Sequence, residues 1–180
     1  MYKTVLLVSL LLATTMVCGQ SRKYNLGRTP TSQEVQTRDI SVSPTGEGLP
    51  PGQGSAKDGR SLYLAQCASC HGVRGEGRPG NPPVAGGQGT LKSDKPSTTV
   101  GSYWPYATTV WDYINRAMPY QQPGSLSPDD VYSITAYVLY LNGIAGENEV
   151  LNAKTLPKIV MPNRDGFVPD PRPDTKAAKH

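Results

Sequence analysis

Two cysteines and a histidine in the run Cys67-Ala68-Ser69-Cys70-His71 have the types and spacing that most clearly indicate chemistry in this chain. Two thiols three residues apart can each form a thioether to one vinyl group of a haem, and the imidazole that follows directly then lies beneath the iron. The run therefore predicts a covalent attachment site for haem c through Cys67 and Cys70, with His71 as an axial ligand.

A Cys-x-x-Cys pair can also bind zinc or form a redox disulfide. Zinc would need two further ligands, and the only other cysteine and histidine are Cys18 and His180. A thioredoxin-like motif normally opens a helix within a strand-helix-strand unit, whereas this run follows helix-like sequence and precedes a glycine-rich loop. Both alternatives fit the sequence less well than haem attachment does.

The ligand on the opposite face of the haem is predicted to be a methionine. Met118 precedes Pro119, which ends a helix-like segment and favours a loop that returns over the haem, although a methionine can also simply fill a core. Met161 is the rival candidate, but it follows the last predicted helix. A histidine and a methionine would leave no open position on the iron and stabilise its ferrous form, which predicts electron transfer.

Other residues are expected to orient the histidine and to meet the haem propionates. The second ring nitrogen of His71 needs an acceptor, and the backbone carbonyl of Pro82 or Pro83 is the candidate. Polar-tipped aromatic residues just before the second predicted helix can bind propionates or serve as ordinary packing: Tyr103, Trp104 and Tyr106. Three arginines can compensate the propionate charge or lie exposed: Arg74, Arg78 and Arg116.

Three helices are expected to position these residues. The first covers about residues 56–69 and the second about 105–117, with Pro105 in its first turn. The third begins after Ser127 as the N-cap and ends before Gly143. The predicted fold class is therefore all-α, with three or more helices around one covalent haem.

The last helix is predicted to be largely buried and to cross the first one closely. Gly59 lacks a side chain and Tyr137 is large, so the two backbones can approach at this pair. The stripe expected to face the core, with the residues that widen it, is Val131, Ile134, Val138 and Leu141 with Ala136, Tyr137 and Tyr140.

The chain of 180 residues contains 17 prolines and 19 glycines, so much of it is predicted to lack regular structure. We divide it into a signal peptide, an extended polar arm, a haem domain and an extended proline-rich C-terminal tail: residues 1–19, 20–55, 56–145 and 146–180. The N-terminal arm can be a flexible tether or a segment that wraps a partner.

The first 19 residues carry one lysine and a short apolar run, which predicts a secretory signal and a periplasmic location. Cys18 can be lipidated or be removed with the leader, and a membrane anchor is expected only in the first case. The formal net charge of +4 gives no argument for nucleic-acid binding, so the predicted partner is a protein.

These motifs together resemble class I cytochrome c. The resemblance covers about residues 56–143 and includes the haem-binding run, a proline about a dozen residues later, the Met-Pro pair and an aromatic-bearing last helix. Further stretches resemble the cytochrome subunit of bacterial sulfane (sulfite) dehydrogenase, the SoxD-like component of the Sox sulfur-oxidation system: 49–54, 101–109, 116–119, 131–132, 135–137 and 161–167.

The resemblance implies a periplasmic cytochrome that accepts single electrons from a molybdopterin-containing sulfur dehydrogenase subunit and passes them to a downstream cytochrome or oxidase. Such a subunit is not expected to be catalytic by itself. Well-known members of the family carry a second haem, whereas this chain has one Cys-x-x-Cys-His run. Two other functions stay open: a shuttle cytochrome, soluble or lipid-anchored, that serves a terminal oxidase, and a haem enzyme or gas sensor in which Met118 leaves the iron.

Overall fold

The computed structural model describes Tyr24 and residues 26–170 of the chain. The chain divides into two units, residues 1–39 and 40–180. The predicted signal peptide, with Cys18, and the last ten residues lie outside the described part. Within that part, no helix combines the length and the apolar character that a membrane crossing requires.

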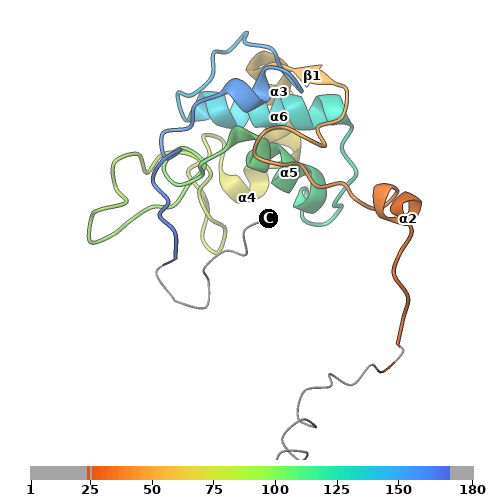
Figure 1. Cartoon of the computed structure of the whole chain (residues 1–180). Coiled ribbons are helices and arrows are strands. Elements are labelled where there is room, and N and C mark those ends of the chain that lie inside the picture. The colour runs from red at the N-terminus through yellow and green to blue at the C-terminus, as the bar shows by residue number, and fades with distance from the viewer. Residues whose placement is uncertain (1–23, 25, 171–180) are drawn as a thin grey trace, which may run out of the picture. The chain divides into compact units, whose positions relative to one another are not determined.

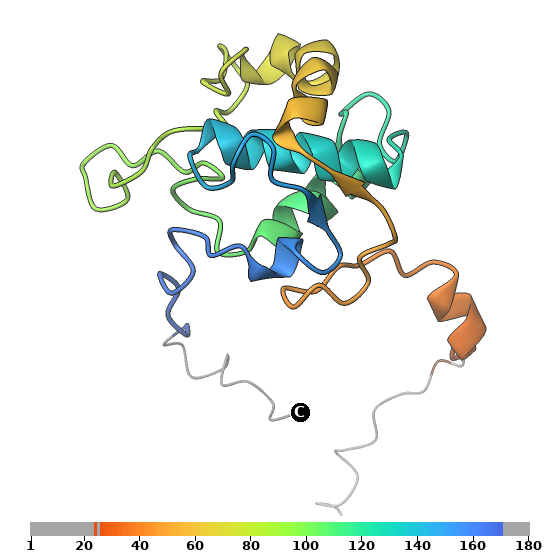
Figure 2. The same ribbon diagram turned by 90° about the horizontal axis from the view of Figure 1, so that it is seen from above.

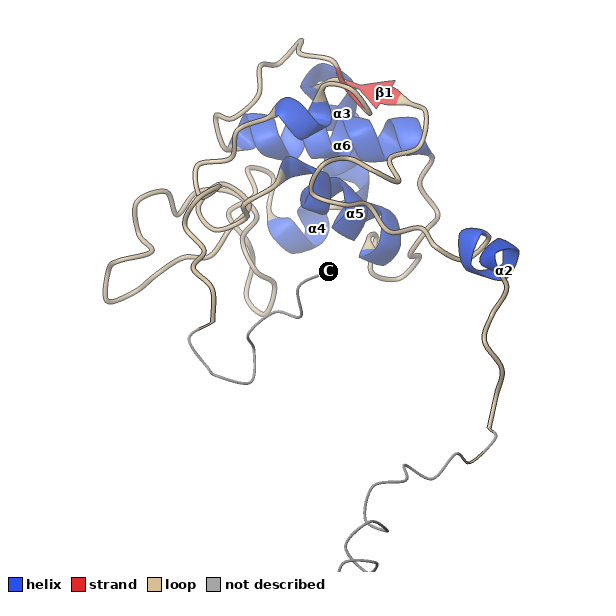
Figure 3. Ribbon diagram, in the orientation of Figure 1, coloured by secondary structure: helices blue, strands red, loops and turns tan. Residues whose placement is uncertain are grey.

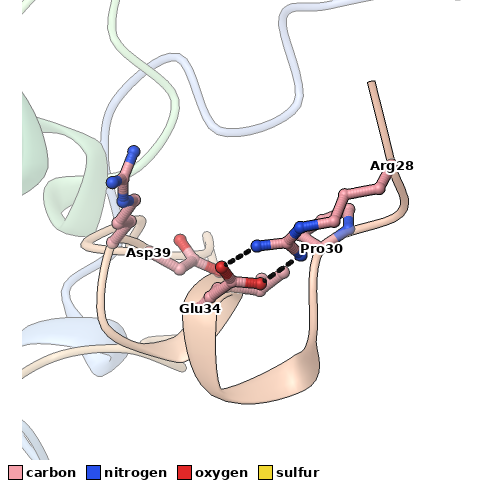
Figure 4. Close-up of a pocket in the computed structure, with 6 residues that line it drawn as sticks. Arg28, Pro30, Glu34 and Asp39 are labelled. Carbon is pink, nitrogen blue, oxygen red and sulfur yellow. Dashed lines mark hydrogen bonds and ion pairs between the residues drawn. The ribbon is translucent and has the colours of Figure 1, made fainter. Parts of the chain in front are cut away.

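One short helix, α2 (Ser32–Gln36), forms in the described part of the first unit (Figure 1). The Thr31 hydroxyl accepts a hydrogen bond from the Glu34 backbone N–H, and the Glu34 carboxylate accepts one from the Thr31 N–H. Arg28 pairs with the same carboxylate beside a surface cavity of about 560 Å³ (Figure 4), and this pairing lowers the pKa of Glu34 to about 2. No residue of α2 is buried, so capping and this ion pair hold it without a core.

The regular structure of the second unit is mainly helical, as predicted from the sequence, and long loops join its elements (Figure 3). Its α-helices are α3 (Ala56–Gln66), α4 (Ala68–His71), α5 (Ala107–Ala117) and α6 (Pro128–Leu141). The remaining elements are strands β1 (Gln53–Gly54) and β2 (Leu151–Asn152) and the 3₁₀ helix η2 (Leu156–Lys158). The two strands pair antiparallel, with Gly54 opposite Leu151, so β2 joins the tail to the segment that precedes α3.

Two of the predicted helices begin or end at other residues. The first predicted helix is two helices, because Cys67 leaves the helical conformation with φ −121° and ψ −36° and separates α3 from α4. The second starts at Ala107, because Tyr106 is extended, with φ −138° and ψ 133°, and acts as the N-cap. The predicted position of Pro105 in the first helical turn is therefore wrong.

The third predicted helix is confirmed as α6. The Ser127 hydroxyl accepts a hydrogen bond from the Asp130 N–H, and the Asp130 carboxylate accepts one from the Ser127 N–H. Residues 131–139 are all buried, since α6 passes between α3 and α5 and contacts both (Figures 1 and 2). Tyr140, which the sequence places among the residues that widen the buried stripe, keeps 41% of its surface exposed and stacks one face of its ring on Tyr137.

The close crossing of the first and last helices is confirmed, with a different contact than the sequence predicts. A Cβ atom on Gly59 would overlap the backbone carbonyl of Ser133 in α6, and one on Gly54 would overlap the same residue. Tyr137 packs instead on Tyr63 of α3, with ring centroids 5.1 Å apart. The two glycines therefore form a backbone cradle for Ser133.

The end of the N-terminal arm, from residue 40, is extended but bonded to the helices of the second unit. The Val42 N–H donates to the Asp112 carboxylate of α5 at 3.1 Å, and the Tyr132 hydroxyl of α6 donates to the Pro50 carbonyl at 3.0 Å. Residues 40–55 thus pack with the helices of the second unit.

The described part of the C-terminal tail is also mostly irregular, yet three of its side chains complete the core. Leu151 and Leu156 are fully buried, and Met161 is 1% exposed. They are spaced five residues apart, which matches neither a helix nor a strand, so the sequence pattern gave no signal for their burial.

Candidate functional site

The junction of α3 and α4 presents the two cysteines of the haem-binding run on one tight turn. The Cys67 carbonyl accepts hydrogen bonds from the N–H groups of Cys70, at 3.1 Å, and His71, at 2.9 Å. Neither cysteine is in a disulfide, and Cys70 is exposed whereas Cys67 is half-buried. Burial, and then the neighbouring Cys70, raise the pKa of Cys67 to about 11. A reactive thiolate needs the opposite shift of its pKa, so Cys67 does not have the electrostatics of a redox-active thiol.

The imidazole of His71 is oriented by the loop that follows it. Its Nδ1 lies 2.9 Å from the backbone carbonyl of Pro82, and a carbonyl can only accept, so Nδ1 carries the proton. Nε2 is then the ring nitrogen with a lone pair for a metal. Of the two acceptors that the sequence suggested, the structure selects Pro82, and the predicted site residue Pro83 does not take this role.

This loop is closed by backbone hydrogen bonds at several points. The Gly75 carbonyl accepts from the N–H groups of Val84, at 2.9 Å, and Ala85, at 3.0 Å. The Gly77 N–H donates to the His71 carbonyl at 2.7 Å. Residues 75–85 therefore return on themselves and bring the Pro82 carbonyl back to the histidine.

Tyr63 is a residue of the site that the sequence analysis missed. Its ring is 1% exposed, and its hydroxyl donates to the Gly72 carbonyl, directly after His71, at 3.0 Å. Burial is the main cause that raises the pKa of Tyr63, so the hydroxyl stays protonated and able to donate. A tyrosine on a helix gives no sequence signal for such a bond, because its acceptor comes close only after the chain has turned.

The two candidate methionine ligands lie in different environments. Met118 caps the C-terminus of α5 in an extended conformation, with φ −125° and ψ 147°, and its side chain is only partly buried. Met161 is 1% exposed in the hydrophobic core. The thioether of Met161 is therefore enclosed by other side chains, whereas that of Met118 keeps accessible surface.

The aromatic residues proposed for the propionates contact the tail and α5. Tyr103 packs edge-on against Phe167 with centroids 5.2 Å apart, and its carbonyl accepts from the Asn163 side chain at 2.7 Å. Trp104 packs edge-on against Tyr113 at 5.7 Å. These contacts join the two residues to the tail and to α5, and a role at the propionates stays a prediction.

The residues of the haem-binding run fit a covalent haem. Two cysteines outside any disulfide lie on one turn, His71 offers Nε2 with its tautomer fixed by Pro82, and Met118 keeps accessible surface. A c-type haem needs two cysteines that bond to its vinyl groups, and an imidazole and a thioether that can bind its iron. The helical fold and these donors define the class of protein as a c-type cytochrome.

The comparisons with known proteins agree with this class. The family model of cytochrome c matches residues 56–142. A chain in the crystal structure of the sulfane dehydrogenase SoxCD from Paracoccus pantotrophus is 44% identical, with a TM-score of 0.76, over 86% of this chain and 76% of that one. The chain therefore belongs to the cytochrome c family and carries covalently bound haem c.

Two thiosulfate dehydrogenases are also similar to this chain. The protein from Stutzerimonas stutzeri strain A1501 is 32% identical over 114 residues, which are 61% of this chain and 33% of that protein. The protein from Psychrobacter arcticus is 30% identical over 119 residues, 59% of this chain and 33% of that protein. The chain thus spans about a third of the length of these curated relatives.

Proposed function

We propose that this protein is a single-haem electron carrier in which Cys67 and Cys70 form the thioethers and His71 and Met118 are the axial ligands. The observation that carries the proposal is the hydrogen bond from His71 Nδ1 to Pro82, which leaves Nε2 for the iron. The bound haem supplies one-electron chemistry between ferric and ferrous iron.

The residues of the chain serve this function by holding ligands rather than by binding a substrate. The Pro82 carbonyl fixes the tautomer and the orientation of the His71 ring. Tyr63 anchors the backbone next to it through Gly72. Met118 would supply the second iron ligand, and its soft thioether would stabilise ferrous iron.

A spectroscopic titration with carbon monoxide tests this function. We expect the reduced haem-loaded protein to show the bands of a low-spin c-type cytochrome and to keep them when carbon monoxide is added, because both axial positions are filled. The Met118→Ala variant is the positive control, since it has an open position. Carbon monoxide binding to the native protein would favour the haem enzyme or gas sensor over the electron carrier.

We further propose that the protein is the electron-accepting subunit of a periplasmic, molybdopterin-dependent sulfane or sulfite dehydrogenase that passes electrons to a downstream cytochrome or oxidase. Support comes from the likeness to a chain of SoxCD, which covers 86% of this chain and so extends beyond the cytochrome c match at residues 56–142. A likeness that includes the irregular arms is expected of a dedicated subunit more than of a free shuttle.

Gel filtration with the molybdopterin subunit distinguishes these two electron carriers. We expect a stoichiometric complex that is lost when residues 24–39 are replaced by a glycine-serine linker of equal length. The helix of this unit, α2, has no buried residue, so its whole surface is free to contact the partner. The replacement stops at residue 39 because Val42 already bonds to α5. If the complex survives the replacement, residues 24–39 serve only as a tether. If the native chain forms no complex, the protein is a free shuttle cytochrome instead.

A further inference from the structure

Asn142 follows the last residue of α6 and is 9% exposed, with a carboxamide whose hydrogen bonds reach across the domain. Its Oδ1 accepts from the Gly86 N–H at 3.1 Å. Its Nδ2 donates to the carbonyls of Val84, at 3.1 Å, and Val138, at 2.8 Å. One N–H and two carbonyl partners allow a single orientation of the amide group.

The segment that Asn142 holds is the one that orients the haem-binding histidine. Pro82, whose carbonyl accepts from His71 Nδ1, lies two residues before Val84. Val84 also donates its N–H to the Gly75 carbonyl, so this residue is bonded on one side to the loop after His71 and on the other to the end of α6. The position of the Pro82 carbonyl therefore depends on a bond to a helix that is remote in sequence.

The surroundings of Asn142 leave little room for another arrangement. Its backbone carbonyl accepts from the Gln88 side chain at 3.1 Å, which adds a second link to the same loop. A Cβ atom on Gly101 would overlap the Asn142 carboxamide, so a glycine is needed beside it. Close packing on this side keeps the carboxamide directed at Val84 and Gly86.

We propose that Asn142 is a positioning residue for the haem ligand His71, acting through residues 82–86; this inference rests on the proposed ligation by His71. A hydrogen bond from Nδ1–H to a carbonyl makes the imidazole a more basic ligand, which stabilises ferric iron and lowers the midpoint potential. By fixing the Pro82 carbonyl, Asn142 contributes to the redox potential of the haem without contacting it.

The test compares the haem-loaded Asn142→Ala variant with the native protein. We expect the His71 Nδ1 proton to exchange with solvent about tenfold faster in proton NMR spectra, because losing the anchoring hydrogen bonds weakens the contact with Pro82 by an amount of that order. We also expect the midpoint potential to shift upward. Asn152→Ala is the matched control, since the Asn152 side chain accepts from two N–H groups, of Lys154 and Thr155, in a turn of the tail.

The control is expected to lower stability with no change in proton exchange or potential. If Asn142→Ala changes stability alone, as the control does, Asn142 has no positioning role. If that variant does not fold, Asn142→Asp keeps the acceptor for Gly86 and loses both donors; unchanged proton exchange in it overturns the proposal. A native ferric protein in which the His71 ring protons show no paramagnetic shift would instead contradict the ligation itself.

Discussion

The haem-loaded Met118→Ala variant is expected to lose the near-infrared methionine-to-iron band of the ferric protein and to bind carbon monoxide when reduced. Its midpoint potential is expected to fall, because the thioether that stabilises ferrous iron is gone. Met118 is the candidate because it ends α5 with its side chain partly exposed. Absorption spectra of the oxidised and reduced variant, with a redox titration, measure all three effects.

Met161→Ala is the matched control for this experiment, since it removes the same side chain from the core. Met161 is 1% exposed, so its loss leaves a cavity that is expected to cost roughly 2–5 kcal/mol of unfolding free energy. The methionine band is expected to persist, and a denaturant titration measures the loss of stability. A band lost in Met161→Ala and kept in Met118→Ala would reverse the ligand assignment.

The parts of the site that the sequence could predict are those encoded by neighbouring residues. The haem-binding run needs only the spacing of Cys67, Cys70 and His71, and the start of α6 needs only the capping box formed by Ser127 and Asp130. Such features form within one turn of a helix. They do not depend on how the rest of the chain folds.

The residues that orient the ligand could not be predicted, because their partners lie far away in the sequence. The choice of Pro82 over Pro83 depends on the closure of residues 75–85, and the bond from Asn142 to Val84 spans 58 positions. The break at Cys67 also escaped the helical periodicity. A continuous helix would place His71 further along the axis of α3. Instead α4 forms a new turn, in which the N–H groups of Cys70 and His71 donate to the Cys67 carbonyl.

The burial of residues in the two arms also could not be predicted from the sequence. Their prolines predict irregular backbone, and the described arm segments are mostly irregular. Irregular backbone can nevertheless be closely packed, as Met161 shows in the core and Val42 shows beside α5. Composition therefore predicted the local conformation of the arms, while their burial depended on contacts with helices elsewhere in the chain.

Gly59→Ala is expected to destabilise the protein, although the same change inside a helix normally stabilises it by about 1 kcal/mol. The new Cβ atom would overlap the Ser133 carbonyl, and a backbone atom cannot move aside as a flexible side chain can. Forcing α3 and α6 apart would also disturb the packing of Tyr63 on Tyr137. We expect a net loss of about 1–3 kcal/mol in the free energy of unfolding, measured by denaturant titration of the haem-loaded protein.

Gly146→Ala provides the matched control for the crossing of α3 and α6. At Gly146 the nearest atom to a new Cβ is the Glu149 Cβ at 3.7 Å, an ordinary van der Waals contact, so the unfolding free energy is expected to change by less than about 1 kcal/mol. If Gly59→Ala were as stable as this control, the crossing would have to tolerate a wider separation. Tyr63 lies on α3 and bonds to Gly72, the residue after His71. If the Gly59→Ala variant folds with α3 and α6 further apart, its haem spectrum is therefore expected to shift as well.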